Sequence, residues 1–423
     1  MRLSRRRLLG GGAAAGITAG VTAGLAGGYL AGAVHGPRVS QDLSQSYAFR
    51  GTHQAGIVTP VQDRLHFAAF DVSTHSREEL IGLLRLWTDA AELMTQGREV
   101  GTGGAVAGAG NLPPDDTGEA LGLPPSGLTI TFGFGPSLFR DAQGRDRFGL
   151  AGSQPRALRE LPHFPGDDLE PAASNGDLCI QACAHDPQVA VHAIRNLARI
   201  GFGTVALRWS QLGFGRTSTT SVSQDTPRNL FGFKDGTANV VAEQPDDLAQ
   251  HVWVGADDDA AAIWLAGGSY LVARRFKMAI EVWDRQTLDD QEGFIGRSKA
   301  TGAPLSGGDE FTEPDFDLPG SNGEPTIAAD AHVRVVHPDA NHGARMLRRG
   351  YNFVDGTDAL GSLNAGLFFL AFVRNPDTHF IPIQTRMARH DSLMEYLKVT
   401  GSALFAVPPG IAAGEYVGQG LFE

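Results

Sequence analysis

An aspartate held between two glycines is the first feature of this sequence that could carry chemistry. Residues 232–239 read GFKDGTAN, with Asp235 at the centre. Glycines permit a tight turn and let the backbone approach a bulky planar ligand closely. Asp-Gly is also a common turn dipeptide, and a simple turn is the alternative. Phe231 and Phe233 place this carboxylate beside apolar surface, where burial and neighbours can tune its pKa for general-base catalysis.

A histidine about a hundred residues further on is a candidate metal ligand. His332 lies in the apolar segment 327–336, which we expect to form a short strand after a flexible loop. A neutral imidazole is a standard axial ligand to haem iron. The alternative is an ordinary, partly buried histidine. The sequence has no H-E-x-x-H pattern, which argues against a zinc hydrolase.

Two adjacent arginines complete the set of candidate groups. Arg348 and Arg349 precede an aromatic residue at the expected start of a strand. Neighbouring strand residues point to opposite faces, so one arginine can face a pocket while the other meets solvent. Two surface charges at the start of a strand are the alternative. A buried guanidinium would stabilise an anionic peroxide while its O–O bond breaks. An acid, an imidazole and a guanidinium together predict a peroxide-splitting haem site.

The first half of the chain predicts alternating strands and helices that could position these groups. Period-2 and period-3.6 patterns distinguish the two kinds of element. Strands are expected at 66–72, 128–134, 177–183 and 204–212, and helices at 77–93 and 187–200. A Gly/Pro-rich loop covers about 101–127. Cys179 and Cys183 are four residues apart on one strand, too far for a disulfide, so both should be free and buried.

The second half repeats this order loosely. Strands are expected at 277–283 and 366–373, helices at 285–297 and 392–404, and a second long loop at 301–325. Long loops in compact domains often act as lids or binding loops. The order of elements predicts an α+β fold of two ferredoxin-like domains, 34–215 and 216–423, with antiparallel sheets packed together.

The N-terminus and the charge limit where the protein could act and what it could bind. A twin arginine follows Ser4, and a Gly/Ala-rich run ends in a small-x-small cleavage pattern at Ala33. We interpret residues 1–33 as a twin-arginine export signal, because the run is too weakly apolar for a stable membrane span. Loss of its four arginines changes the formal net charge from −12 to −16. Nucleic acid is therefore not expected as a partner.

The chain resembles the dye-decolourising peroxidases, and in particular the twin-arginine-exported group that includes the deferrochelatase/peroxidase of bacterial iron uptake. The resemblance rests on residues 128–139, 232–237 and 401–406 and on the order of the aspartate, histidine and arginine. It covers nearly the whole mature chain. The family's G-x-x-D-G motif falls on Gly232, Asp235 and Gly236.

The resemblance implies a role for each matching residue. Asp235 corresponds to the distal acid, Arg348 to the distal arginine and His332 to the axial iron ligand. Two further stretches correspond to segments that contact the haem. The first is Gly236, Thr237 and Ala238, and the second is His337, Pro338 and Asp339. Asn375 and Asp377 are candidate acceptors for the second ring nitrogen of His332.

The resemblance also implies a cofactor, partners and a location. The cofactor would be non-covalent haem b, one per chain, held mainly by the second domain of a barrel-like fold. The substrates would be hydrogen peroxide and an organic donor such as an aromatic dye. The export machinery, a homo-oligomer and iron-uptake proteins are candidate partners, and the location would be periplasmic or extracellular. Iron release from haem and haem carriage without catalysis are the alternatives.

Overall fold

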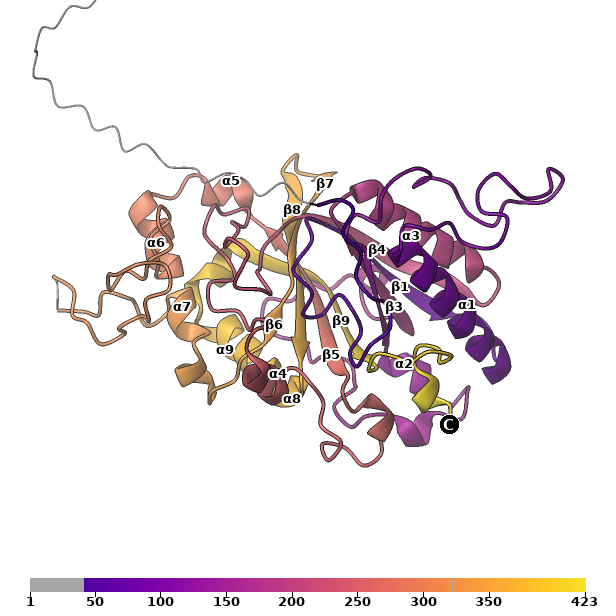
Figure 1. The fold of residues 1–423 in the computed structure, drawn as a ribbon. Helices are drawn as coiled ribbons and strands as arrows, with labels where there is room; N and C mark the ends of the chain where they lie inside the picture. Colours follow the sequence, from indigo (N-terminus) through magenta and orange to yellow (C-terminus); the bar gives the residue numbers. More distant parts are fainter. Residues whose placement is uncertain (1–41, 322) are drawn as a thin grey trace, which may run out of the picture. The chain divides into compact units, whose positions relative to one another are not determined.

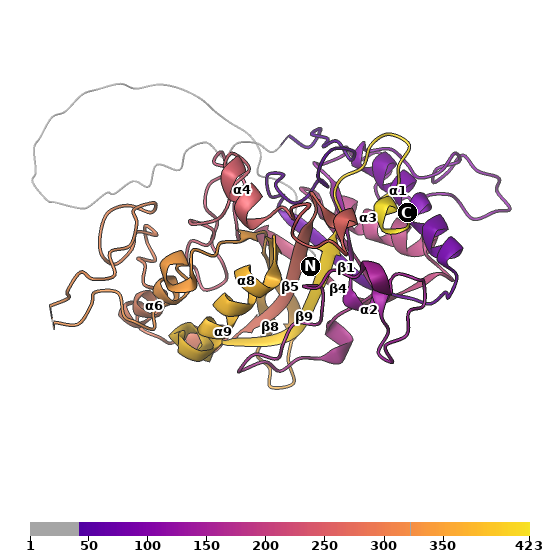
Figure 2. The ribbon, with the colours of Figure 1, turned by 90° about the horizontal axis from the view of Figure 1, so that it is seen from below.

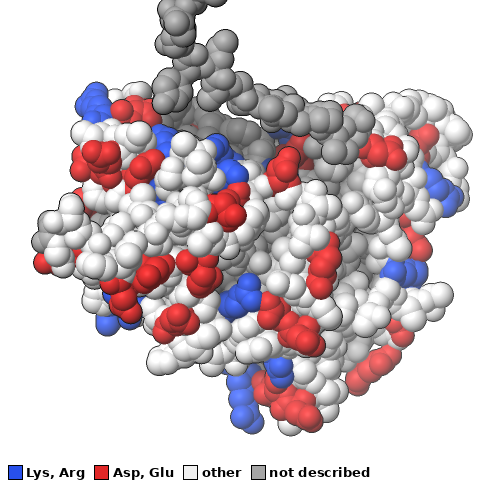
Figure 3. All heavy atoms as spheres, turned by 60° about the vertical axis from the view of Figure 1, so that its left-hand side comes forward, with Lys and Arg blue, Asp and Glu red and all other residues white. Residues whose placement is uncertain are grey.

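The structure is a computed structural model that describes residues 42–321 and 323–423 (Figure 1). The interpretation of residues 1–33 as an export signal falls outside the described residues. Within them, no helix is long and apolar enough to cross a membrane. Acidic side chains are spread over the face of the molecule in Figure 3, with fewer basic ones among them.

The first half has the order βαββαβ of a ferredoxin-like fold. Its elements are β1 (Arg64–Val72), α1 (Arg77–Thr95), β2 (Thr129–Phe134), β3 (Leu178–Ala184), α3 (Pro187–Ile200) and β4 (Val205–Arg216), with the one-turn helix α2 (Pro136–Phe139) after β2. The strands lie in the order β2-β3-β1-β4, and all pairs are antiparallel. Helix α1 begins after Ser76, whose hydroxyl accepts a hydrogen bond from the Glu79 N–H.

The second half has the same strand arrangement with longer insertions. Its strands are β5 (Ser269–Met278), β6 (Leu347–Arg348), β7 (Tyr351–Thr357), β8 (Leu363–Val373) and β9 (Leu397–Val407). Its helices are α4 (Pro245–His251), α5 (Ile280–Trp283), α6 (Leu288–Ile295), α7 (His332–Val335), α8 (Pro376–His379) and α9 (Ile381–His390). Short 3₁₀ helices lie at Ala151–Ser153, Pro171–Ala173, Ile263–Leu265, Pro338–Asn341, Ser392–Tyr396 and Gln419–Leu421.

The two sheets join edge to edge and close into a barrel. Strand β2 meets β9 where Phe134 pairs with Ala406, and β4 meets β7 where Phe214 pairs with Asn352. Because β5 pairs with both β9 and β8, the strand order returns to its start. The predicted α+β fold of two ferredoxin-like halves with a barrel-like antiparallel sheet is confirmed. The division at residue 215 stays a prediction, since one sheet crosses it.

The barrel interior and its outer face form separate hydrophobic cores. Side chains from both halves fill the interior, among them Phe67, Phe353 and Phe405. Cys179 and Cys183 are buried there as free thiols, as predicted. On the outside, α1 and α3 cover one half of the sheet, and α8 and α9 lie against the other half (Figures 1 and 2).

Besides the His332 segment, which is described with the site below, three elements predicted in the second half differ from the structure. The helix predicted at 392–404 is a 3₁₀ turn, Ser392–Tyr396, followed by the strand Leu397–Val407. This strand lies between β5 and β2 and is buried on both faces from Val399 onward. Its residues are therefore almost all apolar or small, and the period-2 alternation that identifies a strand is absent.

The two other differences lie at the end of β5. The strand predicted at 277–283 ends at Met278, and residues from Ile280 turn into the short helix α5, which buries Trp283. The helix predicted at 285–297 spans only Leu288–Ile295, because Thr287 caps its start and Gly296, at φ 85°, ends it.

Candidate active site

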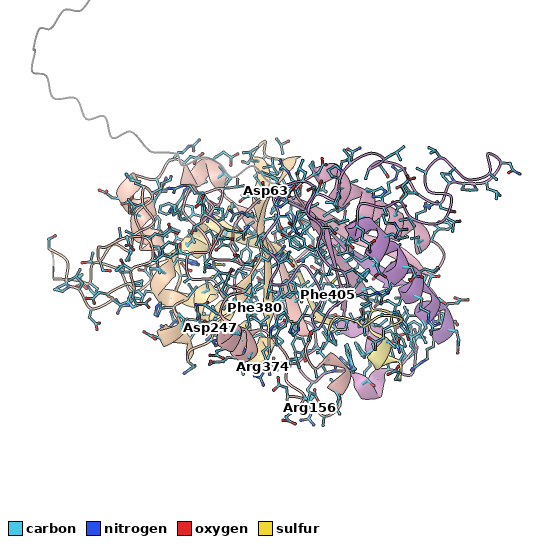
Figure 4. The ribbon with its side chains drawn as sticks, viewed as in Figure 1. Asp63, Arg156, Asp247, Arg374, Phe380 and Phe405 are labelled. Atoms are coloured by element: carbon cyan, nitrogen blue, oxygen red, sulfur yellow. The ribbon has the colours of Figure 1, made fainter. Side chains whose placement is uncertain are left out.

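A cavity of about 580 Å³ lies on the outer face of the second half's sheet. Its walls come entirely from residues between 217 and 397, and helices α6, α7 and α9 border it. Phe380, labelled in Figure 4, belongs to its apolar wall. All nine predicted site residues line this one cavity: Asp235, Gly236, Thr237, Ala238, His332, His337, Pro338, Asp339 and Arg348. The tertiary structure thus brings together groups from three distant segments.

Asp235 and Arg348 form an ion pair in the cavity wall. Arg348 Nη1 donates to Asp235 Oδ1 at 2.9 Å, and the Asn229 amide donates to Oδ2 at 3.3 Å. The two side chains are 17% and 27% exposed, so each keeps a surface toward the cavity. A carboxylate that is held by a fixed cation can exchange a proton with a small ligand without leaving its place.

The turn that carries Asp235 needs its glycines. Gly236 has φ 102°, and a Cβ built there would lie 2.9 Å from the Ser218 Cα. Gly232 has φ 84°, which also favours glycine. The prediction of a tight glycine-dependent turn is therefore confirmed. The close approach that Gly236 permits is to the backbone at Ser218.

Asn239 ties this turn to the strand of Arg348, and the sequence interpretation gave it no role. Its amide donates to the Thr219 carbonyl at 2.7 Å and to the Arg348 carbonyl at 2.8 Å. Its carbonyl oxygen accepts the Arg348 N–H at 2.7 Å. The side chain is buried, with 5% of its surface exposed. Its position at the end of the glycine-rich motif 232–239 is the sequence feature that could have pointed to this role.

The loop 301–325 also fixes the turn. Glu310 accepts hydrogen bonds from Lys234, just before Asp235, and from Thr237 Oγ1 at 3.1 Å, two residues after it. Glu313 and Pro314 of the same loop line the cavity. The long loop therefore forms part of the cavity wall, in line with the expectation of a binding loop.

His332 lies on the short helix α7, not on a strand as predicted. Its segment is apolar because Val335 packs into the protein and Val333 and Val336 line the cavity. A helix of only four residues is too short for the spacing of its apolar residues to distinguish it from a strand.

Asp391 is the hydrogen-bond partner of the His332 ring. Asp391 Oδ2 lies 2.6 Å from His332 Nδ1, and its side chain has no exposed surface. Burial lowers the pKa of His332, but the charge of Asp391 and its hydrogen bond outweigh this and raise that pKa above its usual value. Nδ1 is thus occupied, which leaves Nε2 for a ligand.

The two candidates proposed for this role, Asn375 and Asp377, are wrong. The Asn375 side chain caps α8 by accepting the Asp377 N–H at 2.9 Å. Asp377 forms a surface ion pair with Arg159. Neither residue contacts His332. Asp391, which does, comes directly before Ser392, where the sequence predicted the start of a helix. The sequence did not identify this preceding carboxylate as the partner of His332.

The prediction that one of the two arginines meets solvent is also wrong. Arg349 is fully buried, and its guanidinium donates to the Thr59 carbonyl and to Gln62 Oε1. Arg348 and Arg349 do point to opposite faces of the strand, as expected. Because the sheet is closed, however, the second face is the barrel interior.

The segment after His332 forms part of the cavity rim. His337 Nε2 lies 2.8 Å from Glu313 Oε1, and Pro338 begins a 3₁₀ helix that ends at Asn341. The Asp339 side chain is 89% exposed, which places it at the outside of the cavity.

These residues fit a bound haem. Phe231, Phe276, Phe369 and Met387 are among the large apolar side chains that line the cavity and suit a porphyrin. His332 offers an imidazole nitrogen whose ring is already oriented by a carboxylate, the usual arrangement for a metal-ligating histidine. Asp235 and Arg348 supply a proton-transfer group and a permanent positive charge in the same cavity.

Comparison with known proteins identifies the class. A model of the Dyp-type peroxidase N-terminal domain matches residues 54–215, and a model of the C-terminal domain matches residues 226–412. The chain belongs to the Dyp-type peroxidase family. It is a haem-binding peroxidase.

Individual relatives agree with this assignment. Proteins named Deferrochelatase are 36% identical, and the match with the one from Escherichia coli K12 covers 90% of this chain and 88% of the relative. Among solved structures, an oxyferrous complex of DtpA from Streptomyces lividans is 40% identical with a TM-score of 0.80, covering 90% of this chain and 98% of DtpA. A DyP-type peroxidase from Cellulomonas bogoriensis is 36% identical with a TM-score of 0.78, covering 90% and 99%.

Proposed function

We propose that this protein is an exported peroxidase that holds one non-covalent haem b per chain through His332 and oxidises organic donors such as aromatic dyes. One observation supports the roles given to these residues. The Asp235–Arg348 ion pair and the Asp391-oriented His332 line the same cavity. Bound haem would supply the iron that activates hydrogen peroxide and accepts and passes on electrons.

On the Asp235 side of the cavity, the protein's own groups move a proton and stabilise charge. Asp235 accepts a proton from hydrogen peroxide at a carboxylate oxygen and returns it to the departing oxygen, which leaves as water. The Arg348 guanidinium holds Asp235 through Nη1 and lowers the energy of the negative charge that develops as the O–O bond breaks. Asn229 keeps the other carboxylate oxygen in place.

On the His332 side, the protein orients the imidazole that would hold the haem iron. Asp391 accepts a hydrogen bond from the Nδ1–H of His332, which sets the tautomer and would leave Nε2 to hold the iron. The carboxylate makes the imidazole a stronger donor to the metal. Gly236 to Ala238 and His337 to Asp339 are proposed as the stretches that contact the haem.

The test is a spectroscopic titration of the haem-loaded protein with hydrogen peroxide. Wild-type protein should change its Soret band within seconds. Asp235→Asn should slow this change about 10²–10⁴-fold, the usual contribution of general acid–base catalysis. Arg348→Leu should slow it by about 10²–10³-fold through lost charge stabilisation. An unchanged rate in both variants would contradict the roles given to Asp235 and Arg348, and a wild-type protein whose Soret band does not change with peroxide would contradict the peroxidase function.

A second candidate function is the release of iron from haem with the porphyrin left intact. The 36% identity to proteins named Deferrochelatase favours it. Incubation of the haem-loaded protein with a reductant and an iron chelator would test it. Appearance of free protoporphyrin fluorescence at the rate of iron capture supports release, and no fluorescence over many turnovers argues against it.

We also propose that residues 1–33 direct export by the twin-arginine route to the periplasm or the extracellular space. The twin arginine and the small-x-small pattern support this. Changing Arg5 and Arg6 to lysine should keep the protein in the cytoplasm, as measured by cell fractionation. Normal export of that variant would contradict the proposal. A homo-oligomer and iron-uptake partner proteins remain candidate partners.

A further inference from the structure

A second cavity, of about 700 Å³, lies in the first half of the chain. Its walls come from the end of α1, the loop 97–125 and the first turns of α3. It shares no residue with the active-site cavity, and Figures 1 and 2 show α1 and α3 on the opposite side of the molecule from α6 and α9. The chemistry proposed above therefore makes no use of it.

Polar side chains of α3 hold the loop 97–125 in place, so the cavity is a fixed feature of the fold. Asn196 and Thr117 exchange two hydrogen bonds, at 3.2 Å and 2.9 Å. Arg195 forms an ion pair with Glu119, and the Gln188 amide donates to the Glu119 carbonyl at 3.1 Å. These α3 residues are about two helical turns apart, which places them on the same side of the helix.

His192 lies on α3 between these anchors and forms part of the cavity wall. Its Nε2 lies 2.8 Å from Asp116 Oδ1, and Asp116 also accepts the N–H groups of Val100 and Gly118. The His192 residue is only 5% exposed, yet its Nδ1 has no hydrogen-bond partner among the described residues. Because Nε2 faces a carboxylate and carries the proton, the neutral ring offers Nδ1 to the cavity as an acceptor.

The mouth of the cavity combines a free cation with uncovered apolar surface. Arg98 lines it and is exposed, and within residues 42–321 and 323–423 its guanidinium has no hydrogen bond or ion pair. Val106 and Leu121 also line the cavity, although they are 77% and 51% exposed. Deeper in the wall, Met94 and Val189 are buried. A ligand with an apolar body would cover the exposed side chains.

We propose that this cavity binds a small carboxylic acid that has an apolar body and an O–H or N–H donor at its far end. The donor would hydrogen-bond to His192 Nδ1, and the carboxylate would pair with Arg98 at the mouth. The apolar body would lie between them, against Met94, Leu121 and Val189. The cavity volume is in the range that holds such ligands. This inference goes beyond the proposed function, since binding here requires neither haem nor peroxide.

The test is isothermal titration calorimetry of the haem-loaded protein, in which the active-site cavity is already filled. The probe is 4-hydroxycinnamate, which has a phenol at one end and a carboxylate at the other. Cinnamate lacks the hydroxyl group, and 4-hydroxycinnamyl alcohol lacks the carboxylate. Wild-type protein should bind the probe more tightly than either comparison compound. The Soret band should not change, because this cavity is remote from the active site.

Two variants test the two polar contacts separately. Arg98→Gln should weaken binding of 4-hydroxycinnamate by about 2–5-fold, the range for an exposed ion pair, and leave binding of the alcohol unchanged. Glutamine at position 192 can still donate to Asp116 and so keep the loop in place, but it has no second ring nitrogen. His192→Gln should therefore weaken probe binding by about 2–10-fold, the range for one hydrogen bond, and leave cinnamate binding unchanged.

Arg140 provides a matched control for Arg98. It is an exposed arginine of the same half, it does not line the cavity, and its guanidinium has no partner in the part of the chain that the structure describes. Arg140→Gln should bind all three compounds as the wild type does. No binding of the probe at millimolar concentration would overturn the proposal, and so would equal binding in wild type, Arg98→Gln and His192→Gln. A probe-induced Soret shift that persists in both variants would assign the binding to the active-site cavity and also overturn it.

Discussion

At the scale of single residues, the site depends on side chains that hold the catalytic groups as much as on those groups. Asp391 fixes His332, and Asn239 fixes the backbone of Arg348. Both are buried and fully used in hydrogen bonds, so substitution leaves polar partners unsatisfied. Each therefore gives a sharp test of the proposed roles.

Asp391→Ala should lower the affinity for haem by about 10–100-fold, because the outer-shell carboxylate that orients the iron-binding imidazole is lost. The measurement is the rate of haem transfer to an excess of apomyoglobin. Asp377→Ala is the control, since its carboxylate pairs with Arg159 at the surface. Equal haem loss in the two variants would contradict the role given to Asp391.

Asn239→Ala should destabilise the protein by about 1–3 kcal/mol, because it removes three hydrogen bonds and leaves the Arg348 and Thr219 carbonyls without a partner. Urea unfolding gives the free energy directly. The rate of reaction with peroxide should fall as well, since Arg348 is no longer held. A variant with normal stability but slow reaction would mean that Asn239 acts on chemistry alone.

At the scale of elements, the turn around Asp235 is fixed by backbone conformation. Gly236 has a positive φ and a close neighbour at Ser218, whereas Gly293 lies in α6 with nothing within 4 Å of a built Cβ. The two glycines therefore respond in opposite directions to the same substitution.

Gly236→Ala should destabilise the protein by more than about 1 kcal/mol and impair haem loading, because alanine is strained at that φ and its Cβ meets the Ser218 backbone. Gly293→Ala should stabilise by about 0.5–1 kcal/mol through helix propensity. Thermal unfolding of both variants, with Soret absorbance after haem loading, tests the pair. A tolerated Gly236→Ala would show that the turn can relax.

At the scale of the whole molecule, the helices that cover the outer face of the closed sheet also enclose polar groups on that face. His66 lies on β1 on the face that carries Ala68, and its buried Nδ1 has no hydrogen-bond partner in the part of the chain that the structure describes. Burial lowers the pKa of His66 to about 4, from an ordinary value near 6.5. A histidine buried in its neutral form favours folding fully above pH 6.5, and this contribution is lost as the pH falls toward 4.

The stability of the apoprotein should therefore fall by up to about 3 kcal/mol between pH 7 and pH 4 from this group alone. Urea unfolding at several pH values measures it. His66→Gln should flatten the dependence in that window, because glutamine does not titrate. An identical pH dependence in the variant would assign the acid sensitivity to other groups.

The sequence by itself determined the chemistry and most local elements. Glycine spacing marked the Asp235 turn, hydrophobic periodicity located α1 and α3, and local motifs singled out His332 and Arg348. These features depend on residues that are close in the chain. The same local patterns misassigned the α7 segment and β9, because four-residue turns and strands buried on both faces lack a distinctive period.

Only the tertiary structure decided which groups meet. Asp391 reaches His332 across 59 residues, and Asn239 reaches Arg348 across 109. Arg349 is buried because the sheet closes on itself, and closure depends on pairings such as Phe134 with Ala406 that no local pattern encodes. Long-range pairing and burial are properties of the folded chain, which is why the supporting residues remained hidden in the sequence.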